Sequence, residues 1–548
     1  MVYPQSTSGP PRWLGSSGLG VTVLGAAVLG LALCSGTPIA LADGGGGGGG
    51  GLASLATVAP PQPTGGTILD TADAHTAALQ LGKALFWDTQ VGGDGKTACA
   101  SCHFFAGSDT RLLNSVNPGP DGIFNSLGVT GPGQLARLIN IPASGGARGI
   151  GSDDRRGSQG VASADFVGVD PNPSNAADLC NLTPTSTVFG TNRQVTGRRV
   201  PSMINAVFNR DNFWDGRANH NFNGFNPFGS TANNTDGNLV NMSNSSLASQ
   251  AVGPPNNNVE MSCAHRPFNG SNSLAAKMLA RRPLQFQSVS ANDSVLGSVA
   301  NTAGTGLNTT YGKLIEGAFG VADGSADQSS HFSSFWGQAV QAYMGTLVSD
   351  QTPMDRFLSG DPSRLTSNQQ SGMGIFTSGK GRCATCHAGP ELTDASVSFF
   401  ALNGAVNNDG GDQGFHNTGV RPTTEDLGRG GAGPQGVSWS ISGHDRGAFK
   451  TPGLRNVGLK SSFFHNGGKA TLTDVVNFYA RGGDFANPEQ SSLIKRIGFS
   501  SQDINALVDF MQNGLTDCRV ARELAPFDHP SLLVNNGADL PATGGGSC

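Results

Sequence analysis

A short cysteine motif that occurs twice constrains this chain more than any other feature. Residues 99–103 read CASCH and residues 383–387 read CATCH. With 9 cysteines and 10 histidines among 548 residues, random placement gives about 0.003 such motifs per chain. A structural zinc ion takes four ligands from paired clusters and does not require a histidine directly after each second cysteine. A thioredoxin-type dithiol needs a βαβ setting, for which the sequence shows no pattern.

Covalent attachment of haem, in contrast, uses every part of the motif. Both thiols form thioethers to the vinyl groups, and the adjacent imidazole reaches the iron from one face. The sequence therefore predicts two covalently bound haem c groups. The attachment residues and proximal iron ligands are Cys99, Cys102 and His103 for the first haem, and Cys383, Cys386 and His387 for the second.

The N-terminus has the features of an export signal. Arg12 is the only charged residue among the first 42, and an apolar run follows at 19–33. Ala42 ends a small-x-small cleavage site. We expect residues 1–42 to be a cleaved signal peptide, residues 43–65 to be a Gly-rich linker, and the mature protein to be periplasmic. The apolar run is short for a membrane span, and no later segment is apolar enough to form one.

The net charge bears on which partners the chain could bind, and the remaining cysteines bear on its compartment. The net charge is −5 and no Lys/Arg-rich run exists, which argues against nucleic-acid binding. Four further cysteines of the mature chain are free to form disulfides in an oxidising compartment. They are Cys180, Cys263, Cys518 and Cys548. Their pairing cannot be read from the sequence.

Hydrophobic periodicity predicts a mostly α protein of two similar halves. Apolar residues recur at helical spacing in residues 71–87, 331–348, 471–483 and 500–515, whereas strand signals are few. Glycine makes up 81 of the 548 residues, which indicates long loops between compact elements. We expect two cytochrome c-like haem domains with long loop insertions. Their bounds are 66–330, with an insertion at about 109–195, and 331–525, followed by a tail at 526–548.

A family resemblance appears once these motifs are read in order. The motifs are LGKALFWD…CASCH, NFWDGRA, QAVGPP…VEM, SGKGRCATCHAGPELTD and FKTPGLRNVGLKSSFFHNGGKATLTDVVNFYARGG. They resemble the bacterial di-haem cytochrome c peroxidases and the related MauG enzymes. The matching blocks cover roughly 81–108, 197–264, 335–395 and 448–484, somewhat under half of the chain.

The resemblance implies catalytic roles around the first haem. Glu260 falls where the family keeps a distal-pocket glutamate, and a positioned carboxylate can move the proton that peroxide cleavage requires. Gln250 matches the family's pocket glutamine, and Phe213 is expected to line the same pocket. Trp214 matches the tryptophan between the haems, where an indole can relay electrons from the second haem to the first.

The resemblance also assigns a sixth ligand to the second haem. Standard peroxidases place a methionine at this position, whereas this chain has Tyr479, as MauG does. A phenolate oxygen favours higher iron oxidation states than a thioether does, so the second haem should have a lower potential than one with a methionine ligand. The nearest rival ligand, Met511, lies in a core-face pattern with Leu507.

The sequence offers no second histidine ligand shortly after the first haem motif. No histidine occurs between His103 and His220, the interval where many family peroxidases place a displaceable distal histidine. The first haem is therefore expected to be five-coordinate or water-bound, and to react with peroxide without prior reduction.

The calcium site of the family departs from its usual pattern here. The family holds calcium between its domains with an asparagine side chain and backbone carbonyls. This chain has Arg199 at the asparagine position, and Lys460 and Ser462 at the carbonyl positions. Calcium is therefore doubtful, because one cation beside another is unfavourable without compensating anions. His465 matches a family histidine near the haem interface.

These observations predict a di-haem c peroxidase that reduces hydrogen peroxide to water. The electrons would come from a small periplasmic donor protein, a cytochrome c or a cupredoxin. One alternative is a MauG-like oxidase that acts on a protein or organic substrate through high-valent iron. A second is an oxygenase like the rubber oxygenases, and a third is an electron carrier with both haems closed by protein ligands. The oligomeric state stays open, a homodimer included.

Overall fold

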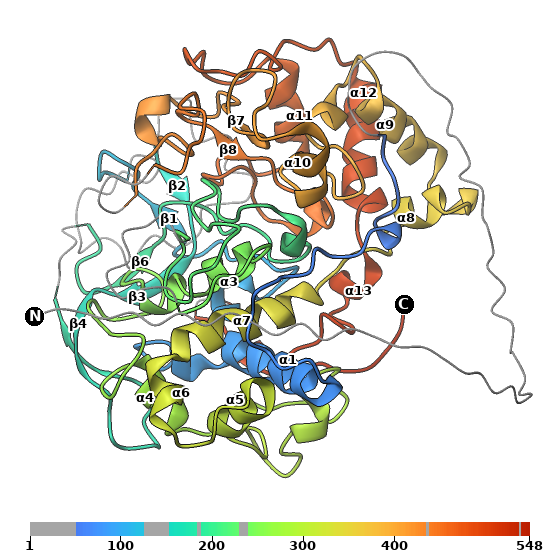
Figure 1. Cartoon of the computed structure of the whole chain (residues 1–548). Coiled ribbons are helices and arrows are strands. Elements are labelled where there is room, and N and C mark those ends of the chain that lie inside the picture. The colour runs from blue at the N-terminus through green and yellow to red at the C-terminus, as the bar shows by residue number, and fades with distance from the viewer. Residues whose placement is uncertain are drawn as a thin grey trace, which may run out of the picture. The chain divides into compact units, whose positions relative to one another are not determined.

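In a computed structural model, helices alternate with long loops and short pairs of strands (Figure 1). The structure describes residues 51–124, 153–183, 188–229, 239–433, 438–535, 537 and 539–548. All of them belong to one contact unit, residues 49–548. The expected signal peptide lies outside the described residues. Within the described part of the chain, no helix combines the length and apolarity that crossing a membrane requires.

The helices include all four segments predicted from apolar periodicity. They are α1 (Ala72–Trp87), α2 (Ala100–His103), α3 (Ser246–Ala251), α4 (Leu274–Leu279), α5 (Tyr311–Phe319), α6 (Ala326–Ser330), α7 (Phe332–Gly345), α8 (Pro353–Leu358), α9 (Ser367–Thr377), α10 (Val397–Asn403), α11 (Leu472–Ala480), α12 (Ser501–Asp509) and α13 (Cys518–Ala521).

Helix α1 positions the first cysteine motif. The Thr71 hydroxyl accepts the N–H of Ala74 over 3.2 Å, which caps the first turn. The apolar face of the helix packs against α5 and α7, and Figure 1 shows α1 and α7 side by side. A side chain at Gly82 would clash with α7, because a Cβ built there lies 1.9 Å from the backbone oxygen of Ala339. Glycine therefore permits the close approach of these two helices.

Helices α9, α11 and α12 surround the second cysteine motif. Each begins with a reciprocal capping box, in which a Thr or Ser hydroxyl and the side chain three residues later cap each other's N–H groups. Their apolar faces meet in a core that includes Phe376, Val476, Leu507 and Phe510. The motif itself follows α9 through a short turn.

The strands of the described residues form five antiparallel pairs. They are β1 (Val116–Asn117) with β2 (Arg155–Arg156), β3 (Gln159–Ala162) with β6 (Arg193–Val195), β4 (Ala164–Gly168) with β5 (Leu179–Leu182), β7 (Phe415–His416) with β8 (Phe449–Lys450), and β9 (Leu532–Leu533) with β10 (Asp539–Leu540). Three of these pairs lie in the expected insertion at 109–195, whose described part therefore contains regular structure. Its strands are too short to give a sequence periodicity.

Two stretches, one in each half, repeat the same backbone path. Asn205 and Asn456 are both left-handed, with φ of +61°, and each precedes a 3-10 turn. Asparagine tolerates this conformation because its short side chain can hydrogen-bond locally. Both asparagines bind Ser349: its N–H donates to Asn205 Oδ1 over 2.7 Å, and Asn456 Nδ2 donates to its hydroxyl over 2.9 Å.

The repeat continues into the NFWDGR and FFHNG turns. Phe213 and Phe464 are left-handed at +61° and +66°, and an isolated antiparallel bridge closes each turn. In this repeat Trp214 and His465 take equivalent places. The two halves expected from the sequence therefore share a turn that faces the other half.

Both ends of the described chain pack against its middle. Residues 51–65, the last part of the expected linker, are ordered: Leu55 is fully buried and its N–H donates to Asp355 Oδ1 over 2.8 Å. Near the C-terminus, Asp528 binds Lys83 Nζ of α1 over 2.9 Å, and His529 stacks on Trp87 at 4.6 Å between ring centroids. The last strands thus complete the core around α1.

Candidate active site: two cavities with a shared wall

The first cavity lies beside the first cysteine motif and has a volume of about 670 Å³. The predicted residues reach its walls from four separate segments of the chain. The residues from the sequence prediction that line it are Cys99, Cys102, His103, Phe213, Trp214, Gln250 and Glu260. The structure therefore brings the predicted attachment residues and the predicted catalytic residues to one cavity.

His103 is oriented by the chain immediately after it. Its Nδ1 lies 3.0 Å from the backbone oxygen of Gly107. Because a carbonyl oxygen only accepts, Nδ1 carries the proton and Nε2 keeps its lone pair. Burial lowers the pKa of His103, which favours the neutral ring that a metal requires. Burial also raises the pKa of Cys99 and Cys102 to about 12, and neither thiol is in a disulfide.

Glu260 and Gln250 bring polar groups into this cavity. Gln250 stands near the end of α3, and Glu260 lies in the loop that precedes α4. Burial raises the pKa of Glu260, and the charge of Arg217 lowers it. The Arg217 guanidinium also lies 4.0 Å from the centroid of the Phe213 ring. A carboxylate whose pKa is raised by burial can both accept and return a proton during a reaction.

The second cavity lies beside the second cysteine motif and has a volume of about 250 Å³. Cys383, Cys386, His387 and Tyr479 all line it. His387 Nδ1 lies 3.1 Å from the backbone oxygen of Pro452, so its Nε2 is left with a lone pair for the same reason as in His103. The two motifs thus present equivalent donor sets to their cavities.

Tyr479 and its rival Met511 both line the second cavity. Tyr479 is in the last turn of α11, against Phe478, with ring centroids 5.0 Å apart. Met511 belongs to the apolar core with Leu507 and Phe510, as the sequence pattern predicts. Burial is the main cause that raises the pKa of Tyr479, and the nearby Cys386 and Cys383 raise it further. The phenolate form of Tyr479 therefore requires a compensating cation such as a metal ion.

A shared wall separates the two cavities. Trp214, together with Arg199, Val200 and Pro201, lines both of them. The Trp214 indole N–H donates to the Arg199 carbonyl over 2.7 Å, and the Trp214 carbonyl accepts the Lys450 N–H over 2.8 Å. The sequence prediction that Trp214 lies between two sites agrees with this geometry.

His465 supports this wall from the second half. Its ring stacks on Phe449 with centroids 3.5 Å apart and meets Trp214 edge-on at 6.3 Å. Its backbone oxygen accepts the Arg199 N–H over 2.7 Å. Burial lowers the pKa of His465 to about 3, so the ring is neutral at physiological pH.

Three cations face the second cavity near the wall: Arg199, Lys450 and Lys460. Arg199 donates to the backbone oxygen of Asp109 over 2.8 Å. Among the described residues, neither lysine ammonium has a hydrogen-bond or ion-pair partner. Burial lowers the pKa of Arg199 to about 10, that of Lys450 to about 8 and that of Lys460 to about 7. Positive side chains without a direct ion-pair partner favour an anionic ligand.

The donor sets fit haem c. Each cavity has two thiols outside disulfides and an imidazole whose Nε2 is free, which is the set that a covalently bound haem uses. The three cations suit the two carboxylates that every haem carries. Calcium does not fit the wall, since a hard cation needs oxygen ligands and here meets three positive side chains.

Several site residues did not emerge from the sequence. Arg217 lies within the NFWDGR motif, but the family resemblance assigns it no role. Lys450 occupies the place in the internal repeat that Arg199 has in the first half, and comparing RRVPSMIN with FKTPGLRN could have identified it. Arg155 and Ser158, which also line the first cavity, come from the insertion. His416 pairs with Asp394 over 2.7 Å beside the second cavity.

Comparison with known proteins agrees with the resemblance seen in the motifs. A family model described as di-haem cytochrome c peroxidase matches residues 76–137 and 176–363. These ranges contain the first cysteine motif together with Trp214, Gln250 and Glu260, whereas the second motif lies beyond them.

Two relatives and one solved structure illustrate the similarity. Cytochrome-c peroxidase IdrP2 of Denitromonas iodatirespirans is 34% identical over 196 residues, which are 32% of this chain and 46% of that protein. Methylamine utilization protein MauG of Methylorubrum extorquens is 30% identical over 202 residues, which are 37% of this chain and 48% of that protein. A structure of a MauG-like protein associated with microbial copper homeostasis has 20% identity and a TM-score of 0.45, over 82% of this chain and 92% of that one.

The chain spans less than half the length of these two relatives. The matched segments nevertheless include the wall residue, the polar cavity residues and the first attachment site. Over these segments, the chain is similar to the di-haem cytochrome c peroxidases and to MauG.

Proposed function

We propose that this protein is a di-haem c peroxidase that reduces hydrogen peroxide to water. Peroxide takes up two electrons and two protons and leaves as two water molecules. The electrons would come from a small electron-transfer protein, a cytochrome c or a cupredoxin. The observation that carries this proposal is the wall residue Trp214, which lines both cavities, each built around one cysteine motif.

The side chains of the first cavity provide the proton transfer. Haem bound through Cys99, Cys102 and His103 would supply the iron that binds and reduces peroxide. Glu260 would take the proton from the near oxygen of peroxide and return it to the far oxygen, which leaves as water. Gln250 would orient the peroxide through its amide, which both donates and accepts hydrogen bonds.

The first cavity lacks a second histidine among the described residues. His103 is the only histidine that lines it there. The next histidine along the chain, His220, is held elsewhere: its Nδ1 lies 2.9 Å from Asp211 Oδ1 and its Nε2 lies 3.0 Å from Arg210. This supports the prediction that peroxide can reach the first site in the fully oxidised protein.

Titration of the oxidised protein with one equivalent of peroxide tests the proposal. We expect rapid changes in the visible haem spectrum without any added reductant. Spectra that change only after one-electron reduction would contradict the open first site. A protein that stays inert in both states would contradict peroxidase function and leave the oxygenase and electron-carrier alternatives.

A MauG-like oxidase is the second candidate, and Tyr479 favours it. A tyrosine at the second cavity would supply a hard anionic ligand, which stabilises an oxidised second haem. In that case the peroxide titration should also produce a near-infrared band, because oxidising equivalents would be shared across Trp214. A peroxidase that passes electrons on rapidly should show no lasting near-infrared band.

We further propose that the protein holds two haem c groups without calcium. Arg199, Lys450 and Lys460 would neutralise haem carboxylates where the family uses the metal ion. Incubation with EDTA should leave the haem spectrum and peroxide reactivity unchanged, and elemental analysis should find no stoichiometric calcium. Loss of reactivity on chelation, restored by calcium, would overturn this assignment.

An exported, periplasmic location is part of the proposal. The two disulfides, Cys180–Cys263 and Cys518–Cys548, suit an oxidising compartment and resolve the pairing that the sequence left open. Mass spectrometry of the mature protein should find an N-terminus near residue 43 if the predicted signal peptide is cleaved.

A further inference from the structure

Glu260 lies in a loop whose internal hydrogen bonds centre on Asn257, whose carbonyl also accepts the N–H groups of Met261 and Ser262 over 3.0 and 2.9 Å. Asn257 Oδ1 accepts the N–H groups of Val259 and Glu260 over 2.9 and 3.1 Å, which forms a local turn. The loop precedes α4 and has no regular structure around Glu260. A carboxylate that transfers protons must nevertheless be held within a fraction of an ångström, so its position needs support from other segments.

The insertion supplies that support through the backbone on both sides of Glu260. Before it, the Val161 N–H donates to the Val259 carbonyl over 3.0 Å, and Gln194 Nε2 donates to the Asn258 carbonyl over 2.8 Å. After it, the Ala264 N–H donates to the Ala164 carbonyl of β4 over 2.8 Å.

Gly160 allows the backbone of the insertion to approach the loop that carries Glu260. A Cβ at this position would lie 1.9 Å from the Val259 carbonyl oxygen, so only glycine permits the contact. The loop and the insertion are therefore in direct backbone contact next to Glu260.

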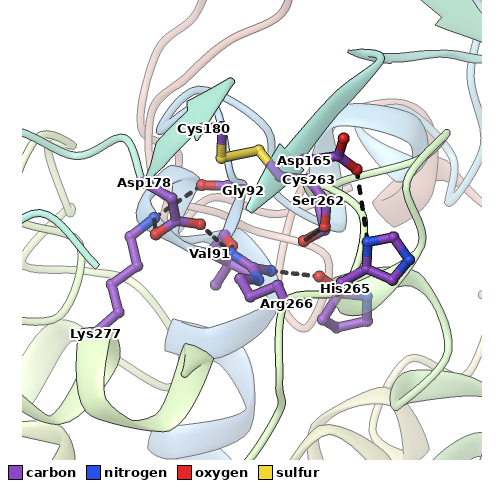
Figure 2. Close-up of a disulfide and its surroundings, with 11 residues drawn as sticks. Val91, Gly92, Asp165, Asp178, Cys180, Ser262, Cys263, His265, Arg266 and Lys277 are labelled. Atoms are coloured by element: carbon purple, nitrogen blue, oxygen red, sulfur yellow. Dashed lines mark hydrogen bonds and ion pairs between the residues drawn. A yellow bond between two sulfur atoms is a disulfide. The ribbon is translucent and has the colours of Figure 1, made fainter. Parts of the chain in front are cut away.

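A disulfide fastens the same two segments covalently (Figure 2). Cys180 of β5 bonds to Cys263, three residues after Glu260. Figure 2 also shows Asp178 between Arg266 and Lys277, at 2.7 and 2.9 Å, and all three side chains are fully buried. Such a cluster resists displacement, because loss of one partner leaves buried charge uncompensated.

The family model covers only part of the insertion. Its two matched ranges leave out residues 138–175, which include β2, β3 and β4. The backbone contacts of Val161 and Ala164 therefore come from an unmatched segment, whereas Gln194 and the disulfide lie within the matched range.

We propose that β3, β4, β5 and β6 of the insertion form a clamp that positions Glu260 over the first cavity, with the Cys180–Cys263 disulfide as its covalent fastening. Cys180, Cys263 and Gln194 are positioning residues, and they act on peroxide chemistry only through Glu260. This inference rests on the proposed function, in which Glu260 transfers the proton of peroxide.

A double-mutant cycle tests the clamp. The rate constant for peroxide with the oxidised protein is measured by stopped-flow absorption in C180S/C263S, in E260Q and in the triple variant. We expect E260Q to lower it about 100-fold or more, as loss of a general acid–base does. The disulfide variant should lower it about tenfold, because a displaced carboxylate works poorly. The triple variant should react like E260Q alone.

The second disulfide provides a matched control. C518S/C548S removes a disulfide of the C-terminal segment, and its rate constant should equal that of the wild type. Haem content is measured for every variant. If C180S/C263S binds fewer than two haems, Gln194→Ala replaces it in the cycle, since this change removes only one hydrogen bond to the loop.

The outcomes separate the clamp from the proposed function. A normal rate in E260Q would contradict the catalytic role of Glu260 and, with it, the proposed function. A slow E260Q with a normal C180S/C263S would overturn the clamp alone. Losses that multiply in the triple variant would also overturn the clamp, because they show an effect that does not pass through Glu260.

Discussion

At the scale of single residues, burial and the charge of Arg217 act in opposite directions on the pKa of Glu260. Burial raises the pKa of Glu260 and Arg217 lowers it. The ionised carboxylate accepts the peroxide proton, so the reaction rate should fall as the pH drops through this pKa. Arg217→Met removes the cation and raises the pKa further, so the acidic limb of the pH–rate profile should move to higher pH. Stopped-flow measurements across the acidic range check this.

The control for this prediction is Arg496→Met, which removes an exposed arginine outside the first cavity. It should leave the acidic limb in place. Asp215, which Arg217 binds over 2.8 Å, keeps a partner in Arg198 at 2.7 Å, so the variant leaves no carboxylate without a partner at this position. An acidic limb that stays put in Arg217→Met would show that another group controls it.

The ligand of the second haem gives another prediction at this scale. Tyr479→Met replaces a hard anionic oxygen by a neutral sulfur, which stabilises the reduced iron relative to the oxidised iron. The midpoint potential of the second haem should rise, as measured by spectroelectrochemistry. Met511→Leu should leave it unchanged. A shift in Met511→Leu but not in Tyr479→Met would reverse the two assignments.

The haem attachment residues could be predicted from the sequence because they belong to short local motifs. The thiols and imidazole of each haem are adjacent in the sequence, so their spacing alone identifies them. The resemblance singled out Glu260 and Tyr479, which the structure finds in separate cavities. The internal repeat marks Lys450 as the counterpart of Arg199. Only the fold shows that Lys450 lines a cavity together with Arg199 and Lys460.

At the scale of elements, the contact between α1 and α7 depends on one glycine. Gly82→Ala would force its Cβ into the Ala339 carbonyl, so it should lower the free energy of unfolding by about 1 to 3 kcal/mol. Gly374, inside α9, has nothing within 4 Å of an added Cβ. Gly374→Ala should therefore raise the free energy of unfolding by about 0.4 to 1 kcal/mol. Urea denaturation measures both changes in the free energy of unfolding. If the two variants change it equally, the close contact between α1 and α7 at Gly82 is not needed for stability.

Helices and strands differed in how far the sequence predicted them. The helices have apolar stripes and capping residues within a single stretch of sequence, and all four expected segments are helical. The insertion's strands are two to five residues long, and their partners are set by distant segments. The hydrogen bond from Ala264 to Ala164 of β4, for instance, joins residues 100 positions apart, which no local pattern records.

At the scale of the whole molecule, a buried lysine joins α1 to two distant segments. Lys83 Nζ binds Asp293 over 2.8 Å and Asp528 over 2.9 Å, and all three side chains are fully buried. Lys83→Met would leave two carboxylates without their cation, so the free energy of unfolding should fall by about 3 to 5 kcal/mol. Lys313→Met, at an exposed position of α5, should change it by less than about 0.5 kcal/mol. Similar urea midpoints for both variants would contradict this role of Lys83.

The contact between Lys83 and Asp528 also sets an order of events during folding. The two residues are 445 positions apart, so the core around α1 lacks its last wall until the segment that carries Asp528 has joined the folding chain. Strand β9, which follows Asp528, also contacts α2 of the first cysteine motif. The first motif is therefore covered only once this late segment has docked.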